Sequence, residues 1–345
     1  MTPDCQVRRE PKEDPIIASI VIPVRNEANR IARCIDSLLV NDFPQTQYEV
    51  LVVDGRSTDQ SRQIIRQKCD HCPSLHLIDN EKKVTAVGLN RAIQRAKGRY
   101  IFILGAHAEY PTNYISACVR ELEKGTADVV GGALVTRPGA DTVIADAIAL
   151  LSQHPFGVGN SAFRIGEGNC FADTVPYGAF RRELFEQWGG YREDLIRNQD
   201  LELNARIRAH GAKIFLLAEP KPVYYNVTTL FKAARQAFLN GLWLGRAWMW
   251  YPVSFCWRHV VPGMFVLALL LCLLGSTSFH IVALTGLIIL GTYFSIALIS
   301  AIGISAQYGF RFLLLMPALF FSYHFAYGIG TLAGLLTSQG KRPEP

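Results

Sequence analysis

Two runs of Val and Ile, each ending in a polar loop, constrain the fold of this chain more than any other feature. Residues 19–24 lead into the loop 25–27, and residues 49–53 lead into the loop 54–59. Such continuous apolar runs are typical of buried parallel strands, because a half-exposed strand would alternate apolar and polar residues. Between them, residues 32–40 have the spacing of an amphipathic helix. The sequence therefore predicts a βαβ unit, and ligands of open α/β sheets bind outside the carboxyl ends of such strands.

The two loops carry side chains that suit a polar ligand with imide and hydroxyl groups. These side chains are Arg25, Asn26, Glu27, Asp54, Ser57 and Asp59. Polar loops follow the strands of any doubly wound domain, so this pattern alone does not identify the ligand. Neither loop contains the G-x-G-x-x-G of dinucleotide-binding domains, and the chain has no G-x-x-x-x-G-K-[ST] phosphate loop. Both absences argue against a dinucleotide site or a P-loop.

The pattern I-V-I-P-x-x-N-E followed by V-V-D-x-x-S-x-D resembles the family 2 glycosyltransferases, whose fold is called GT-A. The resemblance implies an α/β nucleotide-diphospho-sugar transferase domain with a mostly parallel sheet between helices. It also implies that Asp54 accepts a hydrogen bond from the imide of uracil, and that Pro23, Arg25 and Glu27 frame the nucleoside. Ser57 belongs to the same expected site, and the expected donor is a UDP-sugar.

Charge divides the chain into two parts. From residue 259 to residue 340 the only Asp, Glu, Lys or Arg is Arg311. The part before residue 259, about 258 residues long, can bury a full core. The nearly uncharged apolar segment from residue 259 to residue 340 predicts transmembrane helices. The expected organisation is a polar tail (1–17), a GT-A domain (18–230), an amphipathic interfacial linker (231–258), a membrane anchor (259–340) and a second tail (341–345).

The anchor is expected to contain two or three spans. Residues 260–304 are long enough for two spans of about 20 residues with a turn near 275–278, and residues 312–336 are a third candidate. Residues 1–15 are polar and lack the apolar core of a signal peptide, which predicts a cytosolic catalytic domain on a multi-pass protein of the cytoplasmic membrane. Three crossings would place the basic tail outside, against the positive-inside rule. Two crossings with a re-entrant or interfacial third segment would avoid that conflict.

The linker combines indole and basic side chains in the way of an interfacial helix. Four of the five tryptophans lie between residues 243 and 257, and the basic residues of the linker include Lys232, Arg235, Arg246 and Arg258. Such side chains lie at the headgroup level of a membrane, where the arginines could also meet the pyrophosphate of a lipid acceptor. The chain has no sustained basic stripe, and its net charge is +6, so a nucleic-acid partner is not expected.

Residues 197–206, with the sequence R-N-Q-D-x-E-L-N-x-R, contain the candidate catalytic base, Asp200. The dipole at a helix start favours an ionised carboxylate, but Asp is also a common N-cap, and spacing alone leaves both roles open. The family resemblance implies the base, because family 2 enzymes place an E-D pair after a G-G-[FY] turn, here at residues 189–191. Gln199 replaces the glutamate of that pair and is expected at the substrate.

One motif departs from the family pattern. The strand that ends at Leu104 should lead into D-x-D or D-A-H-A, but residues 105–108 read G-A-H-A. The acidic residue that helps to hold a metal is therefore replaced by Gly105, while His107 keeps the second ligand position and Glu109 follows two residues later. Imidazole can bind Mn²⁺, whereas Mg²⁺ prefers oxygen. A weakened site for a divalent cation, metal-independent catalysis and impaired catalysis all remain open.

Two further segments could contribute to the site. Lys82 and Lys83 follow the third predicted strand, where they could meet the diphosphate of the donor or form a solvated pair. Residues 138–172 are rich in glycine and predict a long irregular loop of the kind that often binds a ligand.

The motif at residues 197–206 resembles more narrowly the succinoglycan biosynthesis type, membrane-attached bacterial enzymes that extend a lipid-linked saccharide. We therefore expect a hexosyltransferase-type enzyme that moves one sugar from a UDP-sugar to a lipid-linked, polyprenyl-pyrophosphate saccharide in surface polysaccharide assembly. The processive signature Q-x-x-R-W is absent, which favours single-sugar transfer. The alternatives are a polyprenyl-phosphate sugar synthase and a catalytically impaired nucleotide-sugar-binding membrane scaffold.

Overall fold

The computed structural model describes residues 15–166, 168–252 and 257–338. The main sheet has eight strands in the order β3-β2-β1-β4-β9-β6-β10-β8. They are β1 (Ala18–Val24), β2 (Tyr48–Asp54), β3 (Leu75–Asp79), β4 (Tyr100–Ile103), β6 (Val129–Gly132), β8 (Cys170–Phe171), β9 (Ala179–Arg181) and β10 (Ile214–Leu217). Strands β1 to β4 are parallel to one another, whereas β9 is antiparallel to its neighbours. The prediction of a mostly parallel sheet is confirmed.

The first two strands form the predicted βαβ unit with α1 (Ile31–Leu39). All seven residues of β2 are buried, and in β1 only Pro23 is partly exposed. The register pairs Val24 with Asp54, so both strands end at the same edge of the sheet. The polar loops that follow them therefore lie side by side.

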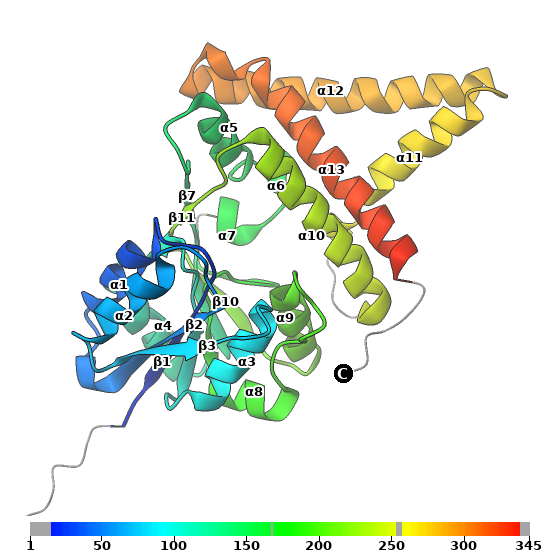
Figure 1. The fold of residues 1–345 in the computed structure, drawn as a ribbon. Coiled ribbons are helices and arrows are strands. Elements are labelled where there is room, and N and C mark those ends of the chain that lie inside the picture. Colours follow the sequence, from blue (N-terminus) through cyan, green and yellow to red (C-terminus); the bar gives the residue numbers. More distant parts are fainter. Residues whose placement is uncertain (1–14, 167, 253–256, 339–345) are drawn as a thin grey trace, which may run out of the picture.

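Helices cover both faces of the main sheet (Figure 1). One face is covered by α1, α2 (Ser61–Cys69) and α4 (Tyr114–Glu123), and the other by α3 (Thr85–Arg95), α8 (Arg182–Trp188) and α9 (Gln199–Ala209). Alternate residues of β1 point to opposite faces of the sheet. Ile20 and Ile22 pack with the first set of helices, and Val21 packs with the second. A short 3-10 turn, η1 (Gln45–Gln47), precedes β2.

A second sheet contains β5 (Ala108–Glu109), β11 (Val223–Tyr225) and β7 (Val135–Arg137), in that order. It joins the loop after β4 to the segment that leads towards the C-terminal helices. Tyr224 of β11 pairs with Ala108 of β5 and with Thr136 of β7. This small sheet therefore lies directly beside the loop that carries His107.

The prediction that residues 138–172 form an irregular loop is wrong in part. The segment contains α5 (Val143–Leu151), α6 (Pro155–Val158) and α7 (Ala162–Ile165). The side chain of Thr142 caps α5 by accepting a hydrogen bond from the N–H of Ala145 at 3.2 Å. The apolar side of α5 packs against the C-terminal helices, a surface formed by residues more than 80 positions away that local sequence does not reveal.

In the described part of the chain, four long helices follow the sheet domain. They are α10 (Leu230–Trp250), α11 (Val261–Gly275), α12 (His280–Tyr308) and α13 (Leu315–Thr337), with short 3-10 turns η3 (Trp257–His259) and η4 (Phe310–Phe312). Within the described residues, the segments 280–308 and 310–337 are long and apolar enough to cross a membrane, whereas α11 has 15 residues. The turn between α11 and α12 lies where the sequence predicts it.

Helix α13 lies along α10 over most of its length (Figure 1). Glycines allow this close approach, because a Cβ at Gly330 would lie 2.1 Å from the Phe238 carbonyl oxygen and a Cβ at Gly241 would lie 2.0 Å from the Tyr327 carbonyl oxygen. The η4 turn before α13 is tied to the catalytic domain by Arg311, whose Nη2 lies 3.1 Å from Asp146 Oδ2 on α5. The α11–α12 hairpin instead projects away from the catalytic domain.

Candidate functional site

Hydrogen bonds join the loops after β1 and β2 into one rigid edge. The N–H of Asn26 donates to Ser57 Oγ at 3.0 Å, and the N–H of Thr58 donates to Asn26 Oδ1 at 2.8 Å. The N–H of Glu27 donates to Ser61 Oγ at 2.7 Å. Asn26 has a positive φ of 57°, a conformation that asparagine tolerates better than most residues. Part of the polarity of these loops therefore serves their own structure.

A cavity of about 570 Å³ opens at this edge of the sheet. Its lining residues are Asp54, Arg56, Ser57, Thr58, Arg62, Arg66, Glu81 and Lys83. Three of the residues predicted from sequence, Asp54, Ser57 and Lys83, are thus brought together. The volume lies in the range of small-molecule sites. Lys82 turns elsewhere, with its Nζ 3.9 Å from Glu193 Oε2.

The carboxylate of Asp54 is fully buried beneath this cavity. Its Oδ2 accepts a hydrogen bond from Arg62 Nη1 at 2.9 Å, and its Oδ1 accepts one from the N–H of Ser57 at 3.1 Å. Arg62 also pairs with Asp79 at 2.5 Å. Asp54 therefore supports the cavity wall through Arg62 and Ser57, and its contact with a uracil imide remains a prediction.

The end of β1 and the loop after β4 bring Glu27 and His107 together. Glu27 Oε1 lies 3.5 Å from His107 Nδ1, and both side chains are partly exposed. The His107 ring also packs edge-on against Tyr224, with ring centroids 5.4 Å apart. Pro23 is half-buried at the end of β1, and Arg25 is exposed just beyond it. These residues form the side of the site nearest the small sheet.

The position of the missing acidic residue is filled by Tyr177. A Cβ on Gly105 would lie 2.6 Å from Tyr177 Cε1, so an aspartate there would require the partly buried tyrosine ring to move. Tyr177 adopts a positive φ of 51° and packs edge-on against Tyr110, whose hydroxyl accepts from the N–H of Gly105 at 2.7 Å. Sequence analysis missed this role, although the P-Y-G turn at residues 176–178 was visible.

Few side chains at the site could act as metal ligands. Within the described residues, no group of three or more His, Cys, Asp or Glu side chains could hold a metal ion. Glu109 does not join His107, because its Oε1 accepts a hydrogen bond from the Tyr225 hydroxyl at 3.1 Å. His107 with Glu27 beside it could supply only part of a coordination shell.

Asp200 is the second residue of α9, and the N-cap is Asn198, whose φ is 59°. This placement does not support the interpretation of Asp200 as the N-cap. Part of the Asp200 side chain is accessible to solvent, but the protein around it displaces much of its water. This desolvation raises the pKa of the Asp200 carboxyl, and hydrogen bonds from backbone N–H groups offset part of the rise. Gln199 directs its Oε1 into a buried position where it has no hydrogen-bond partner among the described residues.

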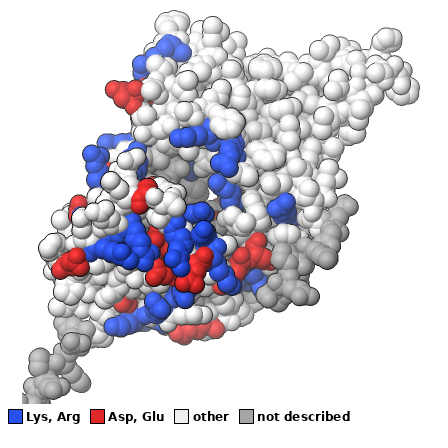
Figure 2. Space-filling view, viewed as in Figure 1, with Lys and Arg blue, Asp and Glu red and all other residues white. Residues whose placement is uncertain are grey.

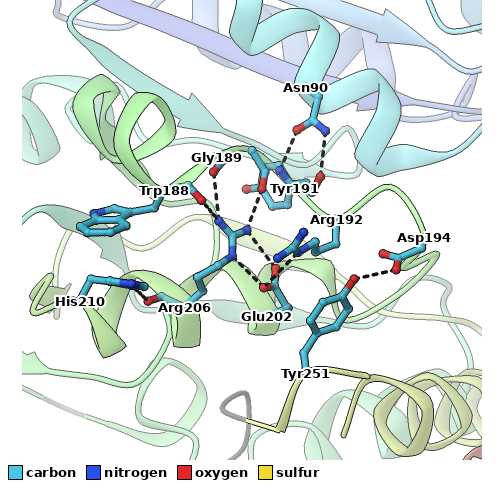
Figure 3. A network of polar contacts seen from close by, with 11 residues as sticks. Asn90, Trp188, Gly189, Tyr191, Arg192, Asp194, Glu202, Arg206, His210 and Tyr251 are labelled. Carbon is cyan, nitrogen blue, oxygen red and sulfur yellow. Dashed lines mark hydrogen bonds and ion pairs between the residues drawn. The ribbon is translucent and has the colours of Figure 1, made fainter. Parts of the chain in front are cut away.

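A buried ion pair holds α9 against the G-G-Y turn (Figure 3). Arg206 Nε lies 2.8 Å from Glu202 Oε1, and the guanidinium also donates to the carbonyl oxygens of Gly189 and Gly190 at 3.2 and 2.7 Å. A further bond reaches the carbonyl oxygen of Trp188. The glycines and arginine of the motif thus act together to fix the start of the helix that carries Asp200.

Asn90 of α3 completes this support. Its Oδ1 accepts a hydrogen bond from the N–H of Tyr191 at 2.7 Å, and its Nδ2 donates to the Tyr191 carbonyl oxygen at 2.8 Å. A Cβ at Gly190 would lie 2.3 Å from Asn90 Oδ1, which explains the glycine. Asn90 therefore has a structural role.

Helix α10 binds the loop that leads to Asp200. The Nδ2 of Asn198 donates to the Asn240 carbonyl oxygen at 2.9 Å, and Arg197 Nη1 donates to Asn240 Oδ1 at 2.9 Å. Farther along, the Tyr251 hydroxyl donates to Asp194 Oδ2 at 2.7 Å (Figure 3). Because Asn240 is distant in sequence and unremarkable in type, sequence analysis missed this contact.

Comparison with known proteins identifies the family. A sequence model described as glycosyl transferase family 2 matches residues 19–189. The succinoglycan biosynthesis protein ExoA of Rhizobium meliloti (strain 1021) is 31% identical over 247 residues, which cover 71% of this chain and 72% of that protein. The chain belongs to glycosyl transferase family 2. This family 2 glycosyltransferase is of the succinoglycan biosynthesis type, as its motifs predicted, and the prediction of an enzyme is confirmed.

Two further likenesses extend over almost the whole chain. A protein of Methanococcus voltae, named dolichyl N-acetyl-alpha-D-glucosaminyl phosphate 3-beta-D-2,3-diacetamido-2,3-dideoxy-beta-D-glucuronosyltransferase, is 25% identical over 92% of this chain and 97% of its own. The structure of mannosyltransferase PcManGT from Pyrobaculum calidifontis, in complex with GDP-Man and Mn²⁺, matches 93% of this chain and 90% of its own with a TM-score of 0.57 and 19% identity. The predicted GT-A fold is thereby confirmed.

Proposed function

We propose that this family 2 glycosyltransferase transfers one sugar from a UDP-sugar to a polyprenyl-pyrophosphate saccharide at the membrane surface. One observation carries the proposal: the loop that leads to Asp200 is hydrogen-bonded to α10, the helix that lies along apolar α13. A base that acts on the acceptor hydroxyl is thus next to the helices that would contact lipid. The proposal is supported by the names of the relatives, since one is named for transfer to a dolichyl sugar phosphate and the other for succinoglycan biosynthesis.

In this proposal the donor lies at the carboxyl ends of β1, β2 and β4. Asp54, Ser57 and Lys83 line the cavity for the nucleotide, with Lys83 towards the diphosphate. Pro23, Arg25 and Glu27, at the end of β1 and outside the cavity lining, would contact the nucleoside from that side, and Gln199 would contact the acceptor. Positive side chains at the diphosphate would stabilise the leaving group as negative charge develops on it.

Asp200 is the proposed general base. It would take the proton of the acceptor hydroxyl while that oxygen forms a bond to the anomeric carbon of the sugar. The bond between that carbon and the diphosphate oxygen breaks, and UDP leaves. Desolvation, which raises the pKa of Asp200, makes its carboxylate a stronger base than a solvated aspartate.

A divalent cation would need ligands from the donor as well as from the protein, because His107 and Glu27 supply only part of a coordination shell. His107, with Glu27 beside it, would hold Mn²⁺ or Mg²⁺ together with oxygens of the donor diphosphate. When bound, the cation neutralises charge on the departing diphosphate. An imidazole ligand without a neighbouring aspartate favours Mn²⁺.

The transfer reaction can be tested with the full chain in detergent or lipid vesicles and radiolabelled UDP-sugars. We expect label from one UDP-sugar in a polyprenyl-pyrophosphate saccharide that has gained a single sugar, and no label transfer from GDP-sugars. Label on bare polyprenyl phosphate would instead identify a polyprenyl-phosphate sugar synthase. Donor binding with neither transfer nor hydrolysis would identify the scaffold.

The helices support a cytoplasmic-membrane protein with its catalytic domain and the α12–α13 turn on the cytosolic side. Arg311 at that turn pairs with Asp146 of the catalytic domain, whereas the α11–α12 turn lies at the far tip of the hairpin (Figure 1). In a cysteine-free background, Ser278→Cys should react with an impermeant thiol reagent added outside, and Gln307→Cys should not. Labelling of Gln307→Cys alone would reverse the orientation.

A further inference from the structure

Three arginines, Arg164, Arg197 and Arg235, lie outside the lining of the nucleotide cavity, on the side of the site that contains Tyr224 of β11. The guanidinium carbon of Arg164 lies 5.6 Å from the centre of the Tyr224 ring, and the His107 ring packs on the same tyrosine. Arg197 Nη1 is held by Asn240 Oδ1 at 2.9 Å against α10, the helix that also carries Arg235, and the charges of Arg235 and Tyr224 both act on Arg197. Figure 2 shows Lys and Arg side chains along the hollow between the sheet domain and the helices.

Among the described residues these arginines have no acidic partner, although Arg164 and Arg197 are partly buried and only Arg235 is exposed. Within the described residues, no Asp or Glu oxygen lies within 4.0 Å of Arg164, Arg197 or Arg235. Arg197 is half-buried, and its one side-chain bond is to the neutral oxygen of Asn240, at 2.9 Å. Burial and the neighbouring charge of Arg235 lower the pKa of the Arg197 guanidinium. An anion between the two arginines would relieve both costs.

The other arginines near the helices already have partners. Arg258 Nη2 lies 2.5 Å from Asp173 Oδ2, and Arg311 pairs with Asp146. Arg246 lies over the Trp243 ring at 4.9 Å from its centre, with its Nε 3.5 Å from Thr337 Oγ1. These contacts distinguish Arg235 from Arg246 and Arg258, the other two arginines of the linker.

We propose that Arg197 and Arg235, with Arg164 at the rim, bind the pyrophosphate of the lipid-linked acceptor. This inference rests on the proposed function and adds the site that holds the acceptor. Arginine binds two phosphate oxygens at once, which suits a diphosphate better than a single point charge would. Asn240 is a positioning residue, because it orients Arg197 and holds Asn198 of the loop that carries the base.

Position favours the acceptor over the donor as the source of the diphosphate. Arg235 is on α10, one element away from the apolar helices, and Arg197 is three residues before Asp200. The nucleotide cavity, by contrast, is lined by residues between 54 and 83 at the ends of β2 and β3. A polyprenyl chain that stays in the membrane can present its pyrophosphate at α10.

The test measures equilibrium binding of geranylgeranyl pyrophosphate and, separately, of UDP to the detergent-solubilised full chain. Arg235→Gln and Arg197→Gln should each weaken geranylgeranyl pyrophosphate binding about 10- to 100-fold, the effect of losing charge-assisted hydrogen bonds, and leave UDP binding unchanged. Arg246→Gln is the matched control on the same helix and should change neither affinity.

Each other outcome overturns the assignment. Equal losses in Arg246→Gln would show general attraction of an anion to basic α10, and losses confined to UDP would assign the arginines to the donor. Unchanged binding in Arg235→Gln, whose exposed side chain can be replaced without disturbing the core, would remove the site even if Arg197→Gln does not fold. The binding assay does not depend on sugar transfer, so its result can be interpreted even if the proposed transfer reaction is not observed.

Discussion

Replacing Asp200 with asparagine should lower turnover by about 10²–10⁴ while UDP affinity stays nearly unchanged, because the lost group acts on the acceptor proton. Steady-state transfer kinetics and calorimetry with UDP would measure the two effects separately. The direction of the pKa shift adds a pH test. Since desolvation by the surrounding protein raises the pKa of Asp200, the wild-type rate should fall on acidification at a pH above the usual titration range of aspartate. The variant should not show this acid-side fall in rate.

Stability provides the control for this prediction. A carboxyl group whose pKa is raised in the folded state favours folding only when protonated, and this contribution is lost as pH rises through the folded pKa. At neutral pH the ionised, desolvated Asp200 therefore costs stability, and Asp200→Asn should leave the melting temperature unchanged or higher. A variant with full turnover, or one that melts much earlier, would indicate a structural residue.

Replacing Arg206 with methionine should destabilise the catalytic domain by about 3–5 kcal/mol, the usual cost of leaving one partner of a buried ion pair alone. The Glu202 side chain is 3% exposed and would keep a charge without its main partner. The carbonyl oxygens of Gly189 and Gly190 would also lose their donor. Thermal unfolding of the solubilised protein should show a fall of roughly 6–20 °C.

Arg208 of the same helix offers a matched control. Its side chain is exposed, so Arg208→Met should change the melting temperature by no more than an ordinary surface substitution. Adding Glu202→Gln to Arg206→Met should recover part of the loss, since it removes the unpaired charge. If Arg206→Met melts like Arg208→Met, the network in Figure 3 does not hold the turn.

The local pattern of the sequence was enough to predict much of the fold. The strands at residues 18–24 and 48–54 and the helix at residues 31–39 lie where their patterns place them, because each element buries an apolar run or face of its own. The same patterns predicted that polar loops would meet at one edge, which brings Asp54, Ser57 and Lys83 to one cavity. Local patterns failed over residues 138–172, where α5 is stabilised by distant helices.

What the sequence by itself determined is therefore the family, the order of the strands and helices, and the residue types at the strand ends, all of which depend on short-range periodicity and motifs. Only the tertiary structure decided that Tyr177 fills the place beside Gly105, that Asp54 is sealed beneath Arg62, and that Asn240 holds the loop before Asp200. Each of these contacts joins residues whose separation along the chain, or whose burial, depends on how whole elements pack. A side chain's neighbours in space follow from that packing, and a local pattern does not contain them.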